Sequence, residues 1–553
     1  MNKTLFSYCL LLGLLGLSCC YAVDEEAPVD SERCADCFVL KGILLIPDTR
    51  SSHELMRDEN IAGVQALMDI PGGISKLTQV LGPRYIGKKM NQEDLIELKK
   101  QIIFYYRDQG YPFVIVQYPS QNITSGLLQL VVIEGKLGEV HVSGNKWFPD
   151  AMIKRYIRQK PGTPIQTGPL LNDLAWVNRN PFRHAELIFA QGEQEGTTDI
   201  DVIVKDRFPL RVYVGGDNTG NSATGNARWF AGFNWGNFCM CDQVLSYQYT
   251  TSSDFEQFQS HTINYTALLA CRQVLNIYGG YSQVNPDIIG FKSTGYAAQG
   301  SVRYIFPFGS HLGSSLNDLF VGGDLKNTNN NLVFEGSQNL AVIAMPVNVT
   351  QVCVGYNFAH TNANHQCNFK IESLWSPGRW LPNQEDSHFS ALHPGAVNHY
   401  IYAKAALTER YILPYKFVLF GTFRGQISNE NLVPSEQFGL GGYDTVRGYA
   451  ERVVNYDDAV CINFEFYLPS FKLIPKCDNE LSFLGFFDYG TGRNVHASGG
   501  QENWQQLMGA GPGLRYKMGS YLSARVDLGW KLHRTQYDST LNAKFHVGVI
   551  GSY

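Results

Sequence analysis

Apolar and polar side chains alternate along most of the chain after residue 207. Residues 521–532 place leucine, valine and tryptophan on one face of an extended segment, and Arg525 and Asp527 lie on the other. Residues 460–468 and 541–553 show the same alternation. A period of two predicts half-buried β-strands, and charged residues in a row opposite large apolar ones are typical of a membrane barrel with a water-filled lumen.

We count about sixteen such segments between Leu210 and Tyr553, and bacterial barrels have an even number of strands. Turns at 236–242 and 469–480 and a longer loop at 375–394 separate some of them. The sequence therefore predicts a transmembrane antiparallel β-barrel of about 16 strands over residues 207–553.

The pattern before the barrel is different and includes helical spacing. Residues 92–108 predict a helix that Asn91 caps, because apolar side chains recur every three or four positions. A strand at 38–46 precedes this helix, and strands at 111–118 and 127–134 follow it. This order predicts a small α+β module.

The same order returns in a shorter form. A strand at 137–145 leads to helices at 149–159 and 170–177, and strands at 184–190 and 198–205 complete the set. Two consecutive modules form a repeat. Each module exposes a sheet edge that can accept an extended peptide as an added strand.

The first residues predict export. Lys3 precedes an apolar core over 5–17, and cleavage near Ala22 fits the small residues there. Cys19 and Cys20 leave a lipoprotein signal open as an alternative. The predicted organisation is a signal peptide, a linker, two small domains and the barrel, at residues 1–22, 23–36, 37–135, 136–206 and 207–553.

Composition supports a barrel and argues against a nucleic-acid partner. The chain has 54 glycines, 30 tyrosines and 32 phenylalanines but only 17% charged residues, which is typical of many strands joined by glycine turns. The net charge is −5 and no Lys/Arg run is present, whereas phosphate binding needs a basic surface.

Motifs that could carry catalysis are incomplete, so we expect no enzyme, metal site or cofactor. Residues 82–89 approach a phosphate-binding loop, but Lys89 replaces the residue that holds magnesium. Residues 53–57 begin like a zinc-protease helix and lack the second histidine. Cys34 and Cys37 have the spacing of a redox or zinc half-site without a second half, so we expect a disulfide or free thiols.

One arginine stands in a glycine-rich connection at residues 439–449, between two alternating segments. About forty residues later, Asp488 lies on a predicted strand, within Phe-x-Asp-x-Gly over residues 486–490. A guanidinium and a carboxylate inside a barrel can form a bidentate bond that fixes a long loop. We therefore expect Arg447 and Asp488 to pair, with Arg447 as a solvated loop residue the alternative.

These motifs carry a resemblance to a known family. The chain resembles the outer-membrane transporters of two-partner secretion, the haemolysin secretion and activation family, within the BamA-type superfamily. The residues concerned form a loop motif, a wall motif and a C-terminal barrel signal, namely Val446, Arg447, Gly448 and Tyr449; Phe486, Asp488 and Gly490; and Phe545 and Tyr553. Residues 178–183 also resemble a segment of the family's second small domain.

The resemblance implies the fold, partners and role. The two modules would be periplasmic POTRA domains, and the loop bearing Arg447 would fold into the lumen. The implied partners are an unfolded exoprotein, outer-membrane lipid and the barrel assembly machinery that inserts the chain. The implied role is capture of the exoprotein by strand addition and passage through the barrel pore to the cell surface.

Two alternatives to the implied role stay open, and two features of the sequence differ from the family pattern. A BamA-like insertase shares both motifs but usually carries more POTRA domains, and a diffusion porin would have no use for the modules. Residues 23–36 are too short and acidic to supply the helix that plugs many barrels of the family. Residues 51–80 look like an insertion within the first module.

Overall fold

The computed structural model describes residues 38–48, 62–194, 196–221, 224–288, 291–308, 315–334, 341–343, 346–496, 504–535 and 542–553. The predicted signal peptide and linker, the Cys34–Cys37 pair and residues 53–57 lie outside these ranges. The chain forms two compact units. The first ends at residue 133 and excludes residues 110–114, and the second contains the remainder.

The first unit is built on a four-stranded sheet in the order β3-β2-β6-β5. Its strands are β2 (Gly42–Ile46), β3 (Gly63–Ala66), β5 (Val114–Gln117) and β6 (Leu127–Glu134), and β1 (Phe38–Val39) pairs separately with β4 (Lys89–Met90). Strand β2 is central, pairs in parallel with β3 and β6, and is buried at every residue. Residues 38–46, which the sequence predicts as one strand, are therefore divided between β1 and β2.

Helix α3 (Gln92–Asp108) has the predicted bounds, and its start is fixed by a capping box. The Asn91 side chain accepts a hydrogen bond from the Asp94 N–H at 2.8 Å, and the Asp94 carboxylate accepts one from the Asn91 N–H at 2.9 Å. These bonds satisfy two donors that a helix N-terminus otherwise leaves open. Leu98 and Ile102 are fully buried, so one face of the helix belongs to the core.

The expectation of an insertion at residues 51–80 is wrong for the part that the structure describes. Strand β3 belongs to the sheet of the first unit, and α2 (Ile74–Tyr85) contributes the fully buried Leu77 and Leu81 to its core. Gly82 and Pro83 lie in the last turn of α2. Because neither residue favours a helix interior, the sequence pattern conceals this helix.

The second unit begins with the second α+β module, which has a three-stranded sheet in the order β7-β9-β8. Its elements are β7 (Lys136–Ser143), α4 (Asp150–Tyr156), α5 (Thr167–Val177), β8 (Arg183–Gln191) and β9 (Thr197–Asp206). Strand β9 pairs in parallel with β7 and antiparallel with β8. Phe148, Ile153 and Trp176 pack with Ile200 and Val202 of β9 in one core.

The rest of the second unit is a closed antiparallel barrel of 16 strands in the described part of the chain. The wall strands are β10 (Leu210–Asp217), β11 (Arg228–Phe238), β12 (Gln243–Ser252), β13 (Phe258–Leu268), β14 (Val274–Val284), β16 (Phe291–Pro307), β17 (Ser315–Phe334), β19 (Val347–Thr361), β20 (His365–Pro377), β21 (His399–Ile412), β22 (Val418–Ser428), β25 (Asp458–Tyr467), β26 (Asn479–Arg493), β27 (Trp504–Met518), β28 (Leu522–Lys531) and β29 (Ala543–Ser552). Short β15 (Asp287–Ile288) and β18 (Ala341–Ile343) extend hairpins.

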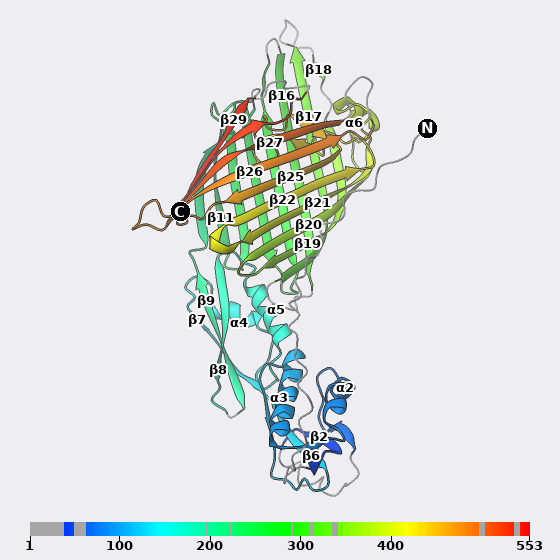
Figure 1. The fold of residues 1–553 in the computed structure, drawn as a ribbon. Coiled ribbons are helices and arrows are strands. Elements are labelled where there is room, and N and C mark those ends of the chain that lie inside the picture. The colour runs from blue at the N-terminus through cyan, green and yellow to red at the C-terminus, as the bar shows by residue number, and fades with distance from the viewer. Residues whose placement is uncertain are drawn as a thin grey trace. The chain divides into compact units, whose positions relative to one another are not determined.

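Strand β10 pairs antiparallel with β29 and closes the barrel. In Figure 1, wall strands β19 to β22 and β25 to β27 lie side by side in chain order. The predicted alternation is present: Trp530 and Phe545 are exposed on the outer face, whereas Asp527 is fully buried on the inner face. The loop bearing Arg447 lies between the eleventh and twelfth of the 16 wall strands, and Phe486–Gly490 lies on the thirteenth. The predictions that this loop connects two alternating segments and that Asp488 lies on a strand are therefore confirmed.

A buried junction joins the second module to the β11–β12 turn of the barrel. The Asp242 carboxylate accepts hydrogen bonds from Arg183 Nη1 at 2.6 Å and Nη2 at 2.7 Å, from Asn180 Nδ2 at 2.7 Å and from the Tyr156 hydroxyl at 2.8 Å. Both side chains of the Arg183–Asp242 pair are 0% exposed. Burial, and the nearby Asp242 charge, raise the pKa of Tyr156 to about 12, so Tyr156 keeps its proton as the donor.

Two further ion pairs extend this junction along the same rim. Asp173 of α5 pairs with Arg272, in the β13–β14 turn, at 2.9 Å, and Arg179 pairs with Asp318 on β17. Residues 178–183, which resemble a segment of the family's second small domain, thus supply part of the contact with the barrel. The module is held to three successive hairpins by charged groups that have little exposure to water.

We predict that Asp242→Ala loosens this junction, because it leaves the Arg183 guanidinium buried without a counter-charge, at a cost of about 3–5 kcal/mol. Hydrogen exchange of residues 150–177 should become faster in the full chain, as mass spectrometry can measure. Asp242→Asn, which keeps the shape of the side chain, should show a smaller effect. Asp254→Ala, in the β12–β13 loop, is the control, and equal exchange in Asp242→Ala and Asp254→Ala would contradict the prediction.

A lumenal loop anchored by Arg447

The long loop between β22 and β25, residues 429–457, folds into the barrel. Its two arms pair as a short hairpin of β23 (Phe438–Leu440) and β24 (Val454–Tyr456). Gly441 and Gly442 follow β23 with φ of +100° and +102°, a conformation that side chains with a Cβ rarely adopt. The glycines singled out in the sequence therefore make the bend that leads to Arg447.

Arg447 lies at the tip of this loop and is 2% exposed. Its Nε donates to Asp488 Oδ2 at 2.7 Å and its Nη2 donates to Asp488 Oδ1 at 2.8 Å, which forms the expected bidentate pair. Its Nη1 donates to Glu465 Oε1 at 2.6 Å. The guanidinium carbon lies 3.6 Å from the ring centroid of Phe486, so an aromatic face covers the cation.

Asp488 is fully buried on the inner wall and has all its acceptor positions engaged. Besides the guanidinium, it accepts from the Arg447 backbone N–H at 3.1 Å and from Asn463 Nδ2 at 2.8 Å. Asp527 of β28 adds a carboxylate 3.8 Å from Arg447 Nη1 and pairs with Arg515 at 2.7 Å. Strands β25 to β28 thus surround the arginine with compensating groups.

The other residues of the loop motif are also buried or bonded. Val446 and Tyr449 are 0% exposed. The Tyr449 hydroxyl donates to the His533 carbonyl at 2.6 Å, and the Gly448 N–H donates to His546 Nε2 at 3.1 Å. The motif therefore packs as a unit against the wall rather than through Arg447 alone.

Glycines of the wall leave the space that this tip occupies. A Cβ at Gly490 would lie 2.8 Å from Val446, one at Gly509 would lie 2.0 Å from the Arg447 carbonyl oxygen, and one at Gly529 would meet Gly448 at 2.5 Å. Gly490, Gly509 and Gly529 lie on the neighbouring wall strands β26, β27 and β28. The structure identifies the Arg447 tip as what fills the space at Gly509.

The two residues of the predicted C-terminal signal do not join this site. Phe545 and Tyr553 are 59% and 86% exposed, at the outer face and at the chain end. Sequence reasoning instead missed Glu465, Arg515 and His546. All three occupy inward-facing positions on wall strands. The alternation of polar and apolar residues could therefore have placed them in the lumen, but it could not have shown that they contact the Arg447 site.

The base of the same loop is fixed to another part of the wall. Glu436 is almost fully buried and accepts from Lys326 Nζ at 2.8 Å, from Gln351 Nε2 at 2.9 Å and from the Tyr402 hydroxyl at 2.7 Å. These partners lie on β17, β19 and β21. Leu432 and Val433 pack with Phe389 of helix α6 (Asp386–Leu392) in an apolar cluster. The loop is therefore held at both its base and its tip.

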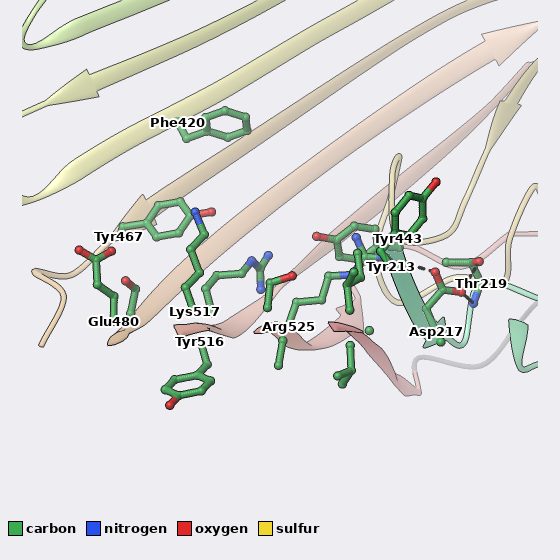
Figure 2. Close-up of a pocket in the computed structure, with 18 of the residues that line it drawn as sticks. Tyr213, Asp217, Thr219, Phe420, Tyr443, Tyr467, Glu480, Tyr516, Lys517 and Arg525 are labelled. Atoms are coloured by element: carbon green, nitrogen blue, oxygen red, sulfur yellow. Dashed lines mark hydrogen bonds and ion pairs between the residues drawn. The ribbon is translucent and has the colours of Figure 1, made fainter. Parts of the chain in front are cut away.

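A cavity of about 810 Å³ lies inside the barrel beside the tip of the loop. Tyr443 of the loop lines it, as do Lys416 and Ser470 in turns on the rim where the second module joins. In Figure 2, Glu480, Lys517 and Tyr467 lie at one end of the cavity, and Tyr443, Asp217 and Arg525 lie at the other. Among the described residues, this cavity therefore lies between the module-side turns and the anchored loop.

In the residues that the structure describes, no helix is long and apolar enough to cross a membrane. The same residues contain no group of three His, Cys, Asp or Glu side chains placed to hold a metal ion. Seven cysteines fall within the described ranges, and all are free thiols: Cys239, Cys241, Cys271, Cys353, Cys367, Cys461 and Cys477.

A closed 16-stranded barrel with α+β modules before it and a buried Arg–Asp loop anchor inside it defines an outer-membrane transporter of the POTRA-barrel class. The chain belongs to the family described as haemolysin secretion/activation protein ShlB/FhaC/HecB, which matches residues 196–276 and 321–516. Residues 75–135 match the POTRA domain of ShlB type.

Curated relatives and a solved structure are similar over most of the chain. The heme/hemopexin transporter protein HuxB of Haemophilus influenzae (strain 86-028NP) is 24% identical over 79% of this chain and 77% of its own length. The outer membrane transporter CdiB of Dickeya dadantii (strain 3937) is 23% identical over 81% of this chain and 78% of its own length. The solved structure of CdiB from Escherichia coli has the same fold, with a TM-score of 0.76 and 17% sequence identity. The match covers 96% of this chain and 92% of the CdiB chain.

The predicted family and fold class are thus confirmed. The chain is an outer-membrane transporter of the two-partner secretion type, with its POTRA modules in the periplasm. The rim of the barrel that contacts the second module is therefore the periplasmic rim. The predicted domain boundaries and the roles of the motif residues stay predictions.

We predict that Arg447→Ala releases the tip of the loop, because Asp488 and Glu465 then remain buried without their cation, at about 3–5 kcal/mol. Hydrogen exchange of residues 440–449 should speed up by about a hundredfold or more. Arg447→Lys should restore only part of the protection, since lysine cannot form the bidentate bond. Arg493→Ala changes an exposed arginine on the same strand as Asp488 and is the control. Unchanged exchange in Arg447→Ala would contradict the anchor.

Proposed function

We propose that this chain captures an unfolded exoprotein with its periplasmic POTRA modules and passes it through the barrel to the cell surface. The observation that carries the proposal is the loop held in the lumen by the Arg447–Asp488 pair, beside a cavity that reaches the periplasmic turns. A polypeptide moving outward from those turns meets this loop. The loop anchor therefore lies on the proposed path of the cargo.

The edge of the second module offers a first contact for an extended segment. Strand β8 is at the edge of the sheet β7-β9-β8, so one side of its backbone has no partner within that sheet. Ile188 and Phe189 on this strand are 48% and 40% exposed. An unpaired edge with exposed apolar side chains suits strand addition, in which backbone bonds give affinity and side chains add little specificity.

The proposed role needs no catalytic chemistry. The charged groups around Arg447 bond to one another. Asp488 and Glu465 accept hydrogen bonds from three nitrogens of the Arg447 guanidinium, and Asp527 accepts one from Arg515. These groups fix the loop instead of presenting a base or nucleophile to a substrate. We also propose that folding of the exoprotein outside the cell supplies the drive, and that the barrel assembly machinery inserts this chain into outer-membrane lipid.

Depletion of the chain should remove one or a few large exoproteins from the culture medium and leave other outer-membrane barrels unchanged. Quantitative proteomics of both fractions measures this, and Arg447→Ala and Asp488→Ala should reproduce the defect. Arg493→Ala is the matched control. A broad fall in outer-membrane barrels would instead support an insertase, and no change in either fraction would leave a porin to test by conductance.

We predict that Ile188→Asp weakens capture of the exoprotein that the depletion identifies. A carboxylate at an exposed apolar position of β8 removes apolar contact area from the edge without touching the core, so the module should stay folded. The amount of exoprotein bound to the purified chain should fall by about fivefold or more. Glu186→Asp, on the same exposed face, is the control. Equal binding by Ile188→Asp and the unchanged chain would exclude this edge as the capture strand.

A further inference from the structure

The wall of the lumenal cavity carries an excess of positive charge. Six basic side chains line it, whereas only Asp217 and Glu480 are acidic. The basic residues are Arg228, Arg410, Lys416, Arg515, Lys517 and Arg525. The excess is local, because the whole chain has a net charge of −5.

Some of these cations are already neutralised by neighbours and others are not. Arg515 pairs with Asp527 at 2.7 Å, and Arg525 lies 3.6 Å from Asp217. In the described part of the chain, no carboxylate forms an ion pair within 4.0 Å of Arg410, Lys416 or Lys517. Arg410 and Lys416 therefore face the cavity without a close counter-charge of the protein itself, whereas Lys517 has only Glu480, its register partner on β26, opposite it.

The position of these cations matches the start of the transport path. Lys416 lies in the β21–β22 turn within the 3₁₀ helix η1 (Pro414–Lys416), Arg410 lies near the end of β21, and Lys517 lies near the end of β27. All three are at the periplasmic end of the barrel. Among the described residues, no side-chain hydrogen bond or ion pair holds these three long side chains, so they can follow a moving chain.

Aromatic side chains complete the cavity wall. Tyr213, Phe420 and Tyr467 line it together with the basic residues, and Tyr443 closes it on the side of the anchored loop. Aromatic faces accommodate apolar side chains without demanding a particular sequence. A surface that mixes aromatic rings with uncompensated cations fits an extended polypeptide whose charged residues are mainly Asp and Glu.

We infer that this cavity is a binding site for acidic stretches of the translocating polypeptide, an inference that rests on the proposed transport function. The contacts are exposed to water and screened by salt, so each is weak. Weak attraction suits a path along which the chain must keep moving. A basic entrance also raises the local concentration of acidic segments before they reach the loop.

Binding of labelled peptides to the purified full chain in an uncharged detergent tests the inference. The probes are fluorescein-labelled peptides of repeated Glu-Gly-Ser units, with Gln-Gly-Ser and Lys-Gly-Ser peptides for comparison. Fluorescence anisotropy should show binding of the acidic peptide only, and this binding should weaken at high ionic strength. A photoreactive residue in place of Phe420 should cross-link to the acidic peptide.

The double variant Lys416→Gln/Lys517→Gln should bind the acidic peptide about fivefold more weakly. Lys472→Gln/Lys476→Gln removes the same charge from exposed lysines in the neighbouring β25–β26 turn, outside the cavity, and should bind like the unchanged chain. Heat-modifiable gel mobility verifies that both barrels are folded.

Equal loss of binding in the two double variants, or equal binding of the acidic and neutral peptides, would overturn the inference. The measurement uses no exoprotein. Its failure therefore leaves the transport function untouched, which the depletion experiment tests separately.

Discussion

The need to neutralise one buried cation organises the lumen of this barrel. The Arg447 guanidinium is removed from water, and an unpaired charge there would be costly. Asp488 and Glu465 supply hydrogen-bonded carboxylates, Asp527 adds a third charge nearby, and Phe486 covers the cationic face. These groups come from three strands of the wall. The contacts of Arg447 therefore fix the loop, and they can form only when the curved wall brings those three strands together.

Close approach of backbone is the second condition for this arrangement. Charges alone would not seat the tip of the loop, because any Cβ at Gly509 or Gly529 would collide with it. A similar combination of charge and shape occurs at the periplasmic rim, where Asp242 forms a bidentate ion pair with Arg183 and Phe182 packs against Gly236. In both places a glycine provides the space and a buried ion pair selects the partner.

The sequence predicted what depends on local periodicity and on short motifs. Helix α3 with its Asn91 cap, the 16 wall strands and the place of Arg447 in a connection between two strands could be predicted, because alternation and capping are local properties. Helix α2 could not, since Gly82 and Pro83 obscure its spacing. Glu465 and His546 could be assigned to the lumen but not to Arg447, because their meeting depends on the register and stagger of the closed barrel.

The anchor draws its partners from the end of the chain. Asp488, Asp527 and His546 lie on the thirteenth, fifteenth and sixteenth wall strands, and the sixteenth also closes the barrel against the first. A polypeptide that lacks its final hairpin can therefore neither close its wall nor give the loop a complete seat. Closure of the wall and seating of the loop therefore depend on the same strand, β29, so the loss of this strand removes both at once.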